Sequence, residues 1–369
     1  MANVKIVNVA GARPNFMKIA PLMEAYRREP RIEPLLVHTG QHYDERMSDL
    51  FFRQLGITEP DFNLEVGSGP HGAQTARIML AFEPLLAELK PQAVVVVGDV
   101  NSTVACGLVA VKLGIPLVHV AAGLRSGERT MPEEINRIVT DAISDLLFCT
   151  EQSGVDNLRG EGVPPDRTFL VGNVMIDCLL RHLSRAQASP ILEELGLKSR
   201  EYALLTLHRP GNVDNPAVLE GILGAMEAIA KDLPVLFPVH PRTRAKLESC
   251  RKAPPSARTG RLRLVEPMGY LEFLKVMSEA RLVLTDSGGI QEETTILKVP
   301  CLTLRESTER PITVEMGSNR IVGVSPERIL AAYRDVMRGG PRSAGIPPLW
   351  DGHAAERIVR ILCERLAGS

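Results

Sequence analysis

Charged side chains follow runs of apolar residues directly at several places in the 369-residue chain. The first such segment, 11–18, reads Gly-Ala-Arg-Pro-Asn-Phe-Met-Lys. Its glycine permits a tight turn, and its proline suits the first turn of a helix, where free backbone amides attract an anion. Arg13 and Lys18 add two cations. We predict a phosphate site here, with an ordinary strand-to-helix turn as the alternative. The segment is not Gly-x-Gly-x-x-Gly and does not indicate a dinucleotide.

A second candidate anion site lies at 285–293, Thr-Asp-Ser-Gly-Gly-Ile-Gln-Glu-Glu. Ser287, Gly288 and Gly289 suit the approach of a backbone to a diphosphate at a helix N-terminus. Glu293 follows one turn into the expected helix, where a carboxylate could accept hydrogen bonds from ribose hydroxyls. The alternative is a glycine-rich turn with a favourable pair of acids.

Candidates for proton transfer lie between these two segments. Asp99 follows the apolar run Val94–Gly98, a position where a carboxylate is rarely placed for stability. Glu133 and Glu134 open an expected helix, although the helix dipole alone explains acids there. His208 and His240 each end an expected strand, and we predict that both face one cleft. The other six histidines are expected to be structural.

The elements that position these residues are short apolar runs separated by helical patterns. Such runs are typical of strands buried on both faces of a parallel sheet. The expected strands are Val4–Ala10, Leu35–Thr39, Ala93–Gly98, Leu117–Ala121, Leu146–Thr150, Thr168–Val171, Tyr202–Leu207, Val235–Val239, Leu262–Val265, Leu282–Thr285 and Cys301–Leu304. We therefore predict an α/β protein of two Rossmann-like, doubly wound domains with an interdomain cleft. The expected domains are residues 1–172, joined by a C-terminal helix in 353–369, and residues 173–352.

Composition narrows the function classes. The formal net charge of −1 gives no reason to expect a nucleic acid as partner. No signal peptide, membrane span, metal-ligand spacing or Gly-x-Ser-x-Gly nucleophile turn is recognised. The six scattered cysteines indicate buried, reduced thiols. We expect a cytoplasmic protein with neither metal nor membrane.

Eight motifs, in order along the chain, resemble those of the non-hydrolysing UDP-N-acetylglucosamine 2-epimerases. They are Gly11-Ala-Arg-Pro14, Gly40-Gln-His42, Val97-Gly-Asp99, Ala122-Gly-Leu-Arg-Ser126, Pro132-Glu-Glu-Ile-Asn-Arg137, His208-Arg209, Asp286-Ser-Gly-Gly-Ile-Gln-Glu-Glu293 and Thr308-Glu-Arg-Pro311. The resemblance implies a glycosyltransferase-B type fold that closes on its ligand. It also implies that UDP-N-acetylglucosamine loses its C2 proton and UDP, giving 2-acetamidoglucal. UDP then adds back to give UDP-N-acetylmannosamine, with no cofactor.

The resemblance also implies roles for individual residues. Asp99 and Glu133 would be the acid–base carboxylates, supported by Lys18, Arg137 and His208. The expected contacts to UDP or substrate are Arg13, His240, Phe273, Ser287, Gly288, Gly289, Glu293 and Arg310. Within this set, Phe273 would contact the uracil and Glu293 the ribose.

One departure bears on activity. The family reads His-Val-Glu-Ala-Gly-Leu-Arg where this chain has His119-Val-Ala-Ala-Gly-Leu-Arg125. Ala121 therefore replaces one of three carboxylates that the family uses. We expect the chain to bind the sugar nucleotide but to turn it over poorly. A second departure, at Asp44 and after Arg209, argues against the allosteric UDP-sugar site of some bacterial members.

Several functions share most of these motifs. A UDP-2,3-diacetamido-2,3-dideoxy-glucuronic acid 2-epimerase is similar in several segments, whereas Thr308–Pro311 favours the N-acetylglucosamine branch. A hydrolysing 2-epimerase would release free N-acetylmannosamine. An inverting glycosyltransferase would need an acceptor, and a non-catalytic UDP-sugar binding protein would exchange no C2 hydrogen. The resemblance further implies a homodimer.

Overall fold

The computed structural model describes residues 3–41, 52–239, 241–249, 261–339 and 345–366. The chain forms two compact units: unit 1 holds Met1–Arg181 and Pro348–Ser369, and unit 2 holds His182–Pro347. The division falls inside helix α7 (Val174–Gln187). The domain boundaries expected at 172–173 and 352–353 stay a prediction.

Unit 1 is built on a seven-stranded sheet whose neighbouring strands are all parallel, in the order β3-β2-β1-β4-β5-β6-β7. Its strands are β1 (Val4–Ala10), β2 (Ile32–His38), β3 (Phe62–Asn63), β4 (Ala93–Val97), β5 (Leu117–Ala122), β6 (Leu146–Cys149) and β7 (Thr168–Leu170). Every residue of β4 is buried, because helices cover both faces of the sheet. The predicted doubly wound parallel sheet is thus confirmed.

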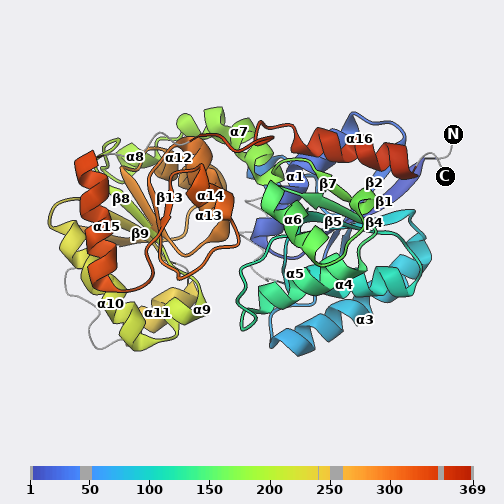
Figure 1. Ribbon diagram of the computed structural model, residues 1–369, viewed down its shortest axis with the longest axis horizontal. Coiled ribbons are helices and arrows are strands. Elements are labelled where there is room, and N and C mark those ends of the chain that lie inside the picture. The colour runs from blue at the N-terminus through green and yellow to red at the C-terminus, as the bar shows by residue number, and fades with distance from the viewer. Residues whose placement is uncertain (1–2, 42–51, 240, 250–260, 340–344, 367–369) are drawn as a thin grey trace. The chain divides into compact units, whose positions relative to one another are not determined.

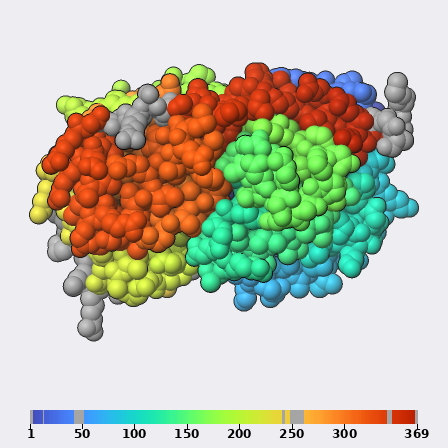
Figure 2. Space-filling view, in the orientation of Figure 1, coloured from blue at the N-terminus to red at the C-terminus, as the bar shows by residue number. Residues whose placement is uncertain are grey.

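The helices of unit 1 lie in layers on this sheet (Figure 1). They are α1 (Arg13–Arg27), α3 (His71–Leu89), α4 (Asn101–Lys112), α5 (Pro132–Ile143), α6 (Gln152–Gly160), the first part of α7, and α16 (Ala354–Leu366). Helix α4 packs between α3 and α5, whereas α16 packs on α1. In Figure 2 the red atoms of the C-terminal segment accordingly lie beside the blue atoms of the N-terminal region.

Unit 2 repeats the pattern with a six-stranded parallel sheet, ordered β10-β9-β8-β11-β12-β13. Its strands are β8 (Ala203–Thr206), β9 (Val235–Pro238), β10 (Leu262–Val265), β11 (Leu282–Thr285), β12 (Cys301–Thr303) and β13 (Asn319–Ile321). Its helices are α8 (Ile191–Glu194), α9 (Pro210–Val213), α10 (Pro216–Ala230), α11 (Pro241–Ser249), α12 (Tyr270–Ser278), α13 (Gly288–Leu297), α14 (Pro311–Glu315) and α15 (Pro326–Gly339).

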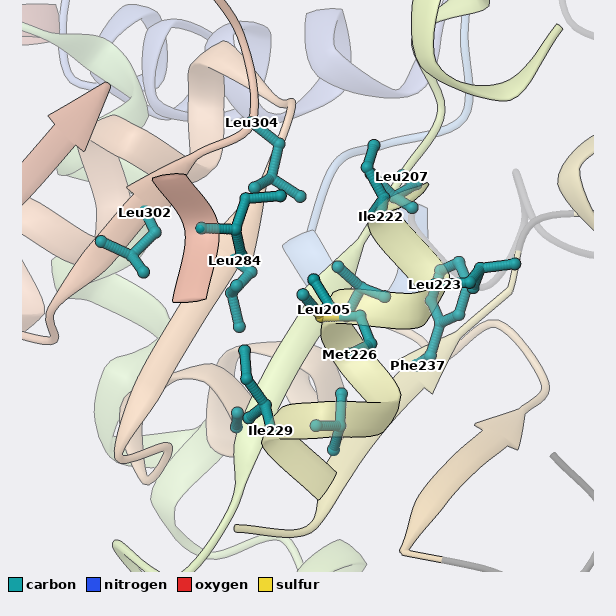
Figure 3. Packing of buried hydrophobic residues seen from close by; sticks show 14 of the residues in the cluster. Leu205, Leu207, Ile222, Leu223, Met226, Ile229, Phe237, Leu284, Leu302 and Leu304 are labelled. Carbon is teal, nitrogen blue, oxygen red and sulfur yellow. The ribbon is translucent and has the colours of Figure 1, made fainter. Parts of the chain in front are cut away.

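One face of the unit 2 sheet packs on α10 to form the core of the unit. Figure 3 shows Ile222, Met226 and Ile229 of α10 packed against residues of the strands, Leu205 and Leu284 among them. The side chains of α10 that face the sheet recur at three- and four-residue spacing, which is the period of a helix packed by one face.

Each sheet has one point where the strand order reverses, between β1 and β4 in unit 1 and between β8 and β11 in unit 2. In open parallel sheets, ligands bind beyond the carboxyl ends of the strands at such a point. Asp99 follows β4, and Ser287–Gly289 follow β11. The fold therefore places most of the sequence-predicted residues where a ligand is expected. Among the described residues, no helix is both long and apolar enough to cross a membrane.

Candidate functional site

Asn15 fixes the loop after β1 to the end of β4. Its Oδ1 atom accepts hydrogen bonds from the N–H groups of Gly11 and Ala12, both at 3.0 Å, and its Nδ2 donates to the Val97 carbonyl at 3.0 Å. The side chain is buried and spans the reversal point of the sheet. Asn15 was not predicted from the sequence to have a role. Its place as the third residue of α1, from which a side chain can reach back to preceding N–H groups, was the available signal.

Lys18 lies on the next turn of α1 and is buried. A Cβ atom added to Gly98 would lie 2.9 Å from the Lys18 Nζ atom, so the ammonium sits against the glycine that precedes Asp99. The φ of Gly98 is +67°, a backbone conformation that L residues rarely adopt. The positive φ therefore favours glycine at this position, whereas the end of a lysine side chain could move aside for a Cβ atom. Arg13 begins α1, but its side chain is outside the part that the structure describes.

Arg137 joins two carboxylates at the edge of unit 1. Its Nη1 pairs with Asp99 Oδ2, and its Nη2 pairs with Glu134 Oε2 at 2.6 Å. Arg137 and Glu134 are both 2% exposed, whereas the Asp99 side chain is 31% exposed. Asn136 donates to the Asp99 carbonyl at 2.9 Å. The arrangement leaves one face of the Asp99 carboxylate accessible while a buried cation fixes the other.

Glu134 and Glu133 have different environments. Burial would raise the pKa of the Glu134 carboxyl, but the N–H groups of Ser126 and Gly127, together with Arg137, outweigh burial and lower it. Glu134 is thus a fixed acceptor that orients a loop and an arginine. Glu133, the residue that the resemblance favoured, is half-buried in the first turn of α5. Adjacency in sequence could not distinguish the two carboxylates, because only the fold determines which one points inward.

Ala121 occupies an irregular position in β5. Its φ is +68°, and the pairing of β5 with β6 shifts register between Val120 and Ala122. The Gly98 N–H donates to the Val120 carbonyl at 3.0 Å, so Ala121 follows the residue that pairs with the end of β4. Ala121 is 2% exposed. A buried, short, apolar side chain therefore lies where the resemblance implied a carboxylate.

At the reversal point of unit 2, His208 pairs with Asp286. The His208 Nδ1 and Asp286 Oδ1 atoms are 2.7 Å apart, with the histidine side chain 51% exposed and the aspartate fully buried. Asp286 also accepts hydrogen bonds from the N–H groups of His208 and Arg209 and from Asn212 Nδ2. Burial would raise the pKa of Asp286, but His208 and these donors hold it below its usual value. Asp286 therefore stays ionised and orients an exposed imidazole.

The first turn of α13 faces a cluster of buried charges in unit 2. A Cβ atom on Gly288 would lie only 2.3 Å from Glu309 Oε1, so the carboxylate packs directly on the glycine. Glu309 Oε2 is 2.8 Å from Arg305 Nη2, and Glu292 Oε1 is 2.5 Å from Arg310 Nε. Burial would raise the pKa of Glu309, but Arg305 and Arg310 outweigh it and hold that pKa far below its usual range.

The helix N-terminus beside this cluster gives it groups that attract an anion. Arg209 Nη2 lies 3.7 Å from Glu309 Oε1, so three arginines accompany the two carboxylates Glu292 and Glu309. The ionised Asp286, which accepts the Arg209 N–H, offsets the third arginine. The attraction for an anion therefore comes from the first N–H groups of the helix, which have no intrahelical acceptor. Arg310 and Gly288 were predicted from the sequence, whereas Arg305 and Glu309 were missed, although their four-residue spacing was a signal.

Glu293 is buried in α13 and accepts a hydrogen bond from the Tyr270 hydroxyl at 3.1 Å. Burial raises the pKa of Glu293 to about 8. Phe273, the expected uracil contact, is half-buried on the same helix as Tyr270. His240 is outside the described residues, so its expected contact stays a prediction.

The pKa of Glu293 predicts a pH dependence of stability. The folded protein retains a proton on Glu293 that an unfolded carboxyl loses above its ordinary pKa of 4.5, so stability decreases as pH rises from there through about 8. Replacing Glu293 with glutamine removes this loss. We expect Glu293→Gln to raise the unfolding free energy by roughly 2 kcal/mol or more near pH 8.5 and by much less near pH 5. Urea unfolding at both pH values tests this, and parallel pH profiles for the two proteins would contradict it.

The two edges offer complementary chemistry. The edge of unit 1 carries an accessible carboxylate with cations beside it, which suits proton transfer at a weakly acidic carbon. The edge of unit 2 carries an electropositive helix terminus with buried arginines, which suits a diphosphate. Within the described residues, no group of three or more His, Cys, Asp or Glu side chains could hold a metal ion.

Comparison with known proteins gives one consistent result. The family model described as UDP-N-acetylglucosamine 2-epimerase matches residues 24–363. The UDP-N-acetylglucosamine 2-epimerase of Methanocaldococcus jannaschii is 42% identical over 97% of this chain and 99% of its own length. The UDP-2,3-diacetamido-2,3-dideoxy-D-glucuronate 2-epimerase of Pseudomonas aeruginosa is 41% identical over 98% of this chain and 100% of its own.

Solved structures agree with these relatives. The crystal structure of the M. jannaschii UDP-GlcNAc 2-epimerase in complex with UDP-GlcNAc and UDP superposes with a TM-score of 0.92 at 42% identity. The match covers 98% of this chain and 99% of that one. The glycosyltransferase-B type fold that the sequence predicted is therefore confirmed.

Proposed function

Because the chain belongs to the UDP-N-acetylglucosamine 2-epimerase family, we propose that it interconverts UDP-N-acetylglucosamine and UDP-N-acetylmannosamine. The reaction is slow, because Ala121 replaces a carboxylate that the family uses. The observation that carries this proposal is the Asp99–Arg137 pair at the strand-order reversal of unit 1. It supplies an oriented, accessible carboxylate where the chemistry needs one. The anion-binding edge of unit 2 supports the leaving-group half of the reaction.

In the first half-reaction a carboxylate base removes the C2 proton. The electrons of the C2–H bond form a C1=C2 double bond, the bond between C1 and the UDP oxygen breaks, and UDP leaves with the electron pair. The C2 proton is only weakly acidic, so base and leaving group must act together. In the second half-reaction the UDP oxygen attacks C1 of 2-acetamidoglucal, and an acid protonates C2 from the opposite face. We assign the acid–base roles to Asp99 and Glu133.

Positively charged groups lie beside the base and stabilise the leaving diphosphate. Arg137 pairs with Asp99, and the Lys18 ammonium lies against the neighbouring Gly98, so both cations lie at the edge of unit 1 that carries the assigned base. The diphosphate gains negative charge as C1–O breaks, and preorganised donors stabilise that charge best. We assign this role to the Ser287 side chain, to the N–H groups of Gly288 and Gly289, and to Arg13 and Arg310, because the Ser287 N–H already donates to Thr285 Oγ1 at 3.0 Å. His208, oriented by Asp286, completes the polar edge of unit 2.

The second candidate substrate is UDP-2,3-diacetamido-2,3-dideoxy-glucuronic acid. The P. aeruginosa enzyme named for that substrate is nearly as similar to this chain as the archaeal relative, at 41% against 42% identity. Both substrates undergo the same elimination and re-addition at C1 and C2. Parallel incubations with the two sugar nucleotides therefore separate the candidates by rate alone.

Incubation with UDP-N-acetylglucosamine in heavy water tests the reaction type. The proposal predicts deuterium at C2, the manno epimer still attached to UDP, and no metal requirement. Free N-acetylmannosamine would indicate a hydrolysing enzyme instead. Transfer of unepimerised sugar to an added acceptor would indicate a glycosyltransferase. Binding without exchange, even after glutamate is restored at 121, would indicate a UDP-sugar sensor and sink the proposal.

We also propose that the protein is a homodimer joined through α3. Leu80 is 73% exposed at the middle of this helix, flanked by exposed Ala76 and Pro84. Two antiparallel copies of α3 related by a two-fold axis at Leu80 would place Ala76 against Pro84 and Arg77 against Glu83. Such self-complementarity is what a two-fold interface requires. Helix α3 lies at the outer side of its layer, beyond α4 (Figure 1).

Charge introduced at Leu80 should dissociate this dimer. We expect Leu80→Glu to lower the mass measured by light scattering from that of two chains to that of one, because two buried glutamates would face each other. Lys90→Glu, at the exposed end of the same helix, is a control that should leave the mass unchanged. A monomeric unaltered protein would contradict the proposal.

A further inference from the structure

We propose that Gln291 positions the diphosphate site of unit 2, by joining the first turn of α13 to the loop that carries Arg310. The inference rests on the proposed function, because that function assigns the diphosphate to these two segments. Gln291 itself would touch no part of the ligand. Its side chain is completely buried in α13.

The carboxamide of Gln291 makes three hydrogen bonds to three different segments. Its Nε2 donates to the carbonyl of Ser287, the residue that precedes α13, at 3.1 Å. Its Oε1 accepts from Thr308 Oγ1 at 2.6 Å and from Asn319 Nδ2 at 2.9 Å. One side chain thus fixes the helix N-terminus, the loop after β12 and the start of β13 relative to one another.

The backbone of Arg310 is held by the same network. Its N–H donates to Thr308 Oγ1 at 3.0 Å, and its carbonyl accepts from Thr313 Oγ1 at 2.7 Å. Thr313 Oγ1 in turn accepts from Asn319 Nδ2 at 3.1 Å. Of the two hydroxyls that position Arg310, that of Thr308 therefore bonds directly to Gln291, and that of Thr313 bonds to its partner Asn319.

This arrangement lets uncharged groups position charged ones. A buried amide that loses a partner leaves donors or acceptors unsatisfied, so the segments it joins keep their relative positions. Donors aimed at a ligand bind best when they need no rearrangement on binding. Gln291 thus preorganises the helix terminus and the Arg310 backbone together for one diphosphate.

Gln291→Met tests the proposal, because methionine has a similar volume and makes none of the three hydrogen bonds. We expect the affinity for UDP, measured by calorimetry, to fall about tenfold or more, with the affinity for uridine, measured by ligand-observed NMR, nearly unchanged. Thr308→Val removes only the hydroxyl between Gln291 and the Arg310 N–H. It should also weaken UDP binding more than uridine binding, and it replaces Gln291→Met as the test if that variant does not fold.

Thr294→Val is the matched control. Thr294 is fully buried one turn further along α13, and its hydroxyl donates to the Ile290 and Gln291 carbonyls of the same helix. This variant should lose stability without changing the ratio of UDP to uridine affinity. An equal loss for both ligands in Gln291→Met, or no loss, would overturn the inference while the proposed function stands. Absence of UDP binding by the unaltered protein would overturn both.

Discussion

Restoring glutamate at position 121 is expected to raise the rate of C2 epimerisation by about 10²–10⁴, the range that a positioned acid or base typically contributes. Ala121 lies in β5 next to β4, the strand that Gly98 and Asp99 follow. We expect a carboxylate added here to join Asp99 and Glu133 at one edge of unit 1. The measurement is the initial rate of UDP-N-acetylmannosamine formation by the variant and the unaltered protein.

The backbone at 121 makes this comparison informative. Its φ of +68° already strains alanine, and glutamate carries the same Cβ atom, so the substitution adds no new backbone cost. Ala121→Gly is the control: it relieves the strain and should stabilise the fold without raising the rate. Ala121→Gln supplies the size of glutamate without its charge. A glutamine variant as fast as the glutamate variant would show that the carboxylate is not what the chain lacks.

Asp99→Asn, made in the Ala121→Glu protein, is expected to lower the rate of deuterium incorporation at C2 by about 10²–10⁴. Asparagine keeps the size of the side chain but can neither accept the proton nor balance the charge of Arg137. The affinity for UDP should remain within about twofold, because the groups assigned to the diphosphate lie elsewhere. The two measurements together separate loss of proton transfer from loss of binding.

Asp145→Asn is the matched control for this substitution. Asp145 is exposed and accepts the N–H of Leu117 at 2.8 Å, at the amino end of β5, opposite to the edge that carries Asp99. Its replacement should leave the exchange rate unchanged. If Asp99→Asn retained the full exchange rate, the acid–base assignment would be wrong, and the role of Asp99 would be limited to its ion pair with Arg137.

The sequence predicted the fold well because parallel strands carry a strong local signal. Runs such as Val94–Val97 are apolar throughout, and only a strand covered on both faces needs that. Strand β3, with two residues, and helix α3 were not predicted. The two-residue strand gives almost no periodic signal, and α3 presents apolar residues on two faces, which obscures the amphipathic pattern.

The site was predicted at the level of motifs rather than of contacts. Asp99 and Lys18 could be selected because each lies soon after an apolar run, and Arg137 came from the family resemblance. Gln291 could not, because its importance comes from partners distant in sequence that only the fold brings close. Glu309 had a local signal in its spacing from Arg305, but its contact with Gly288 had none. Gln291 meets Asn319, and Glu309 meets Gly288, across 28 and 21 residues respectively.

Titration of UDP into the unaltered protein, followed by calorimetry, tests the central claim most directly. We expect saturable binding of one UDP per chain. This binding should weaken when Gly288 is replaced by alanine, because the added methyl group has no room beside Glu309 and would disturb the first turn of α13, whose N–H groups are assigned to the diphosphate. Saturable binding that Gly288→Ala leaves intact, or no binding at all, would contradict the assignment of the diphosphate to Ser287–Gly289.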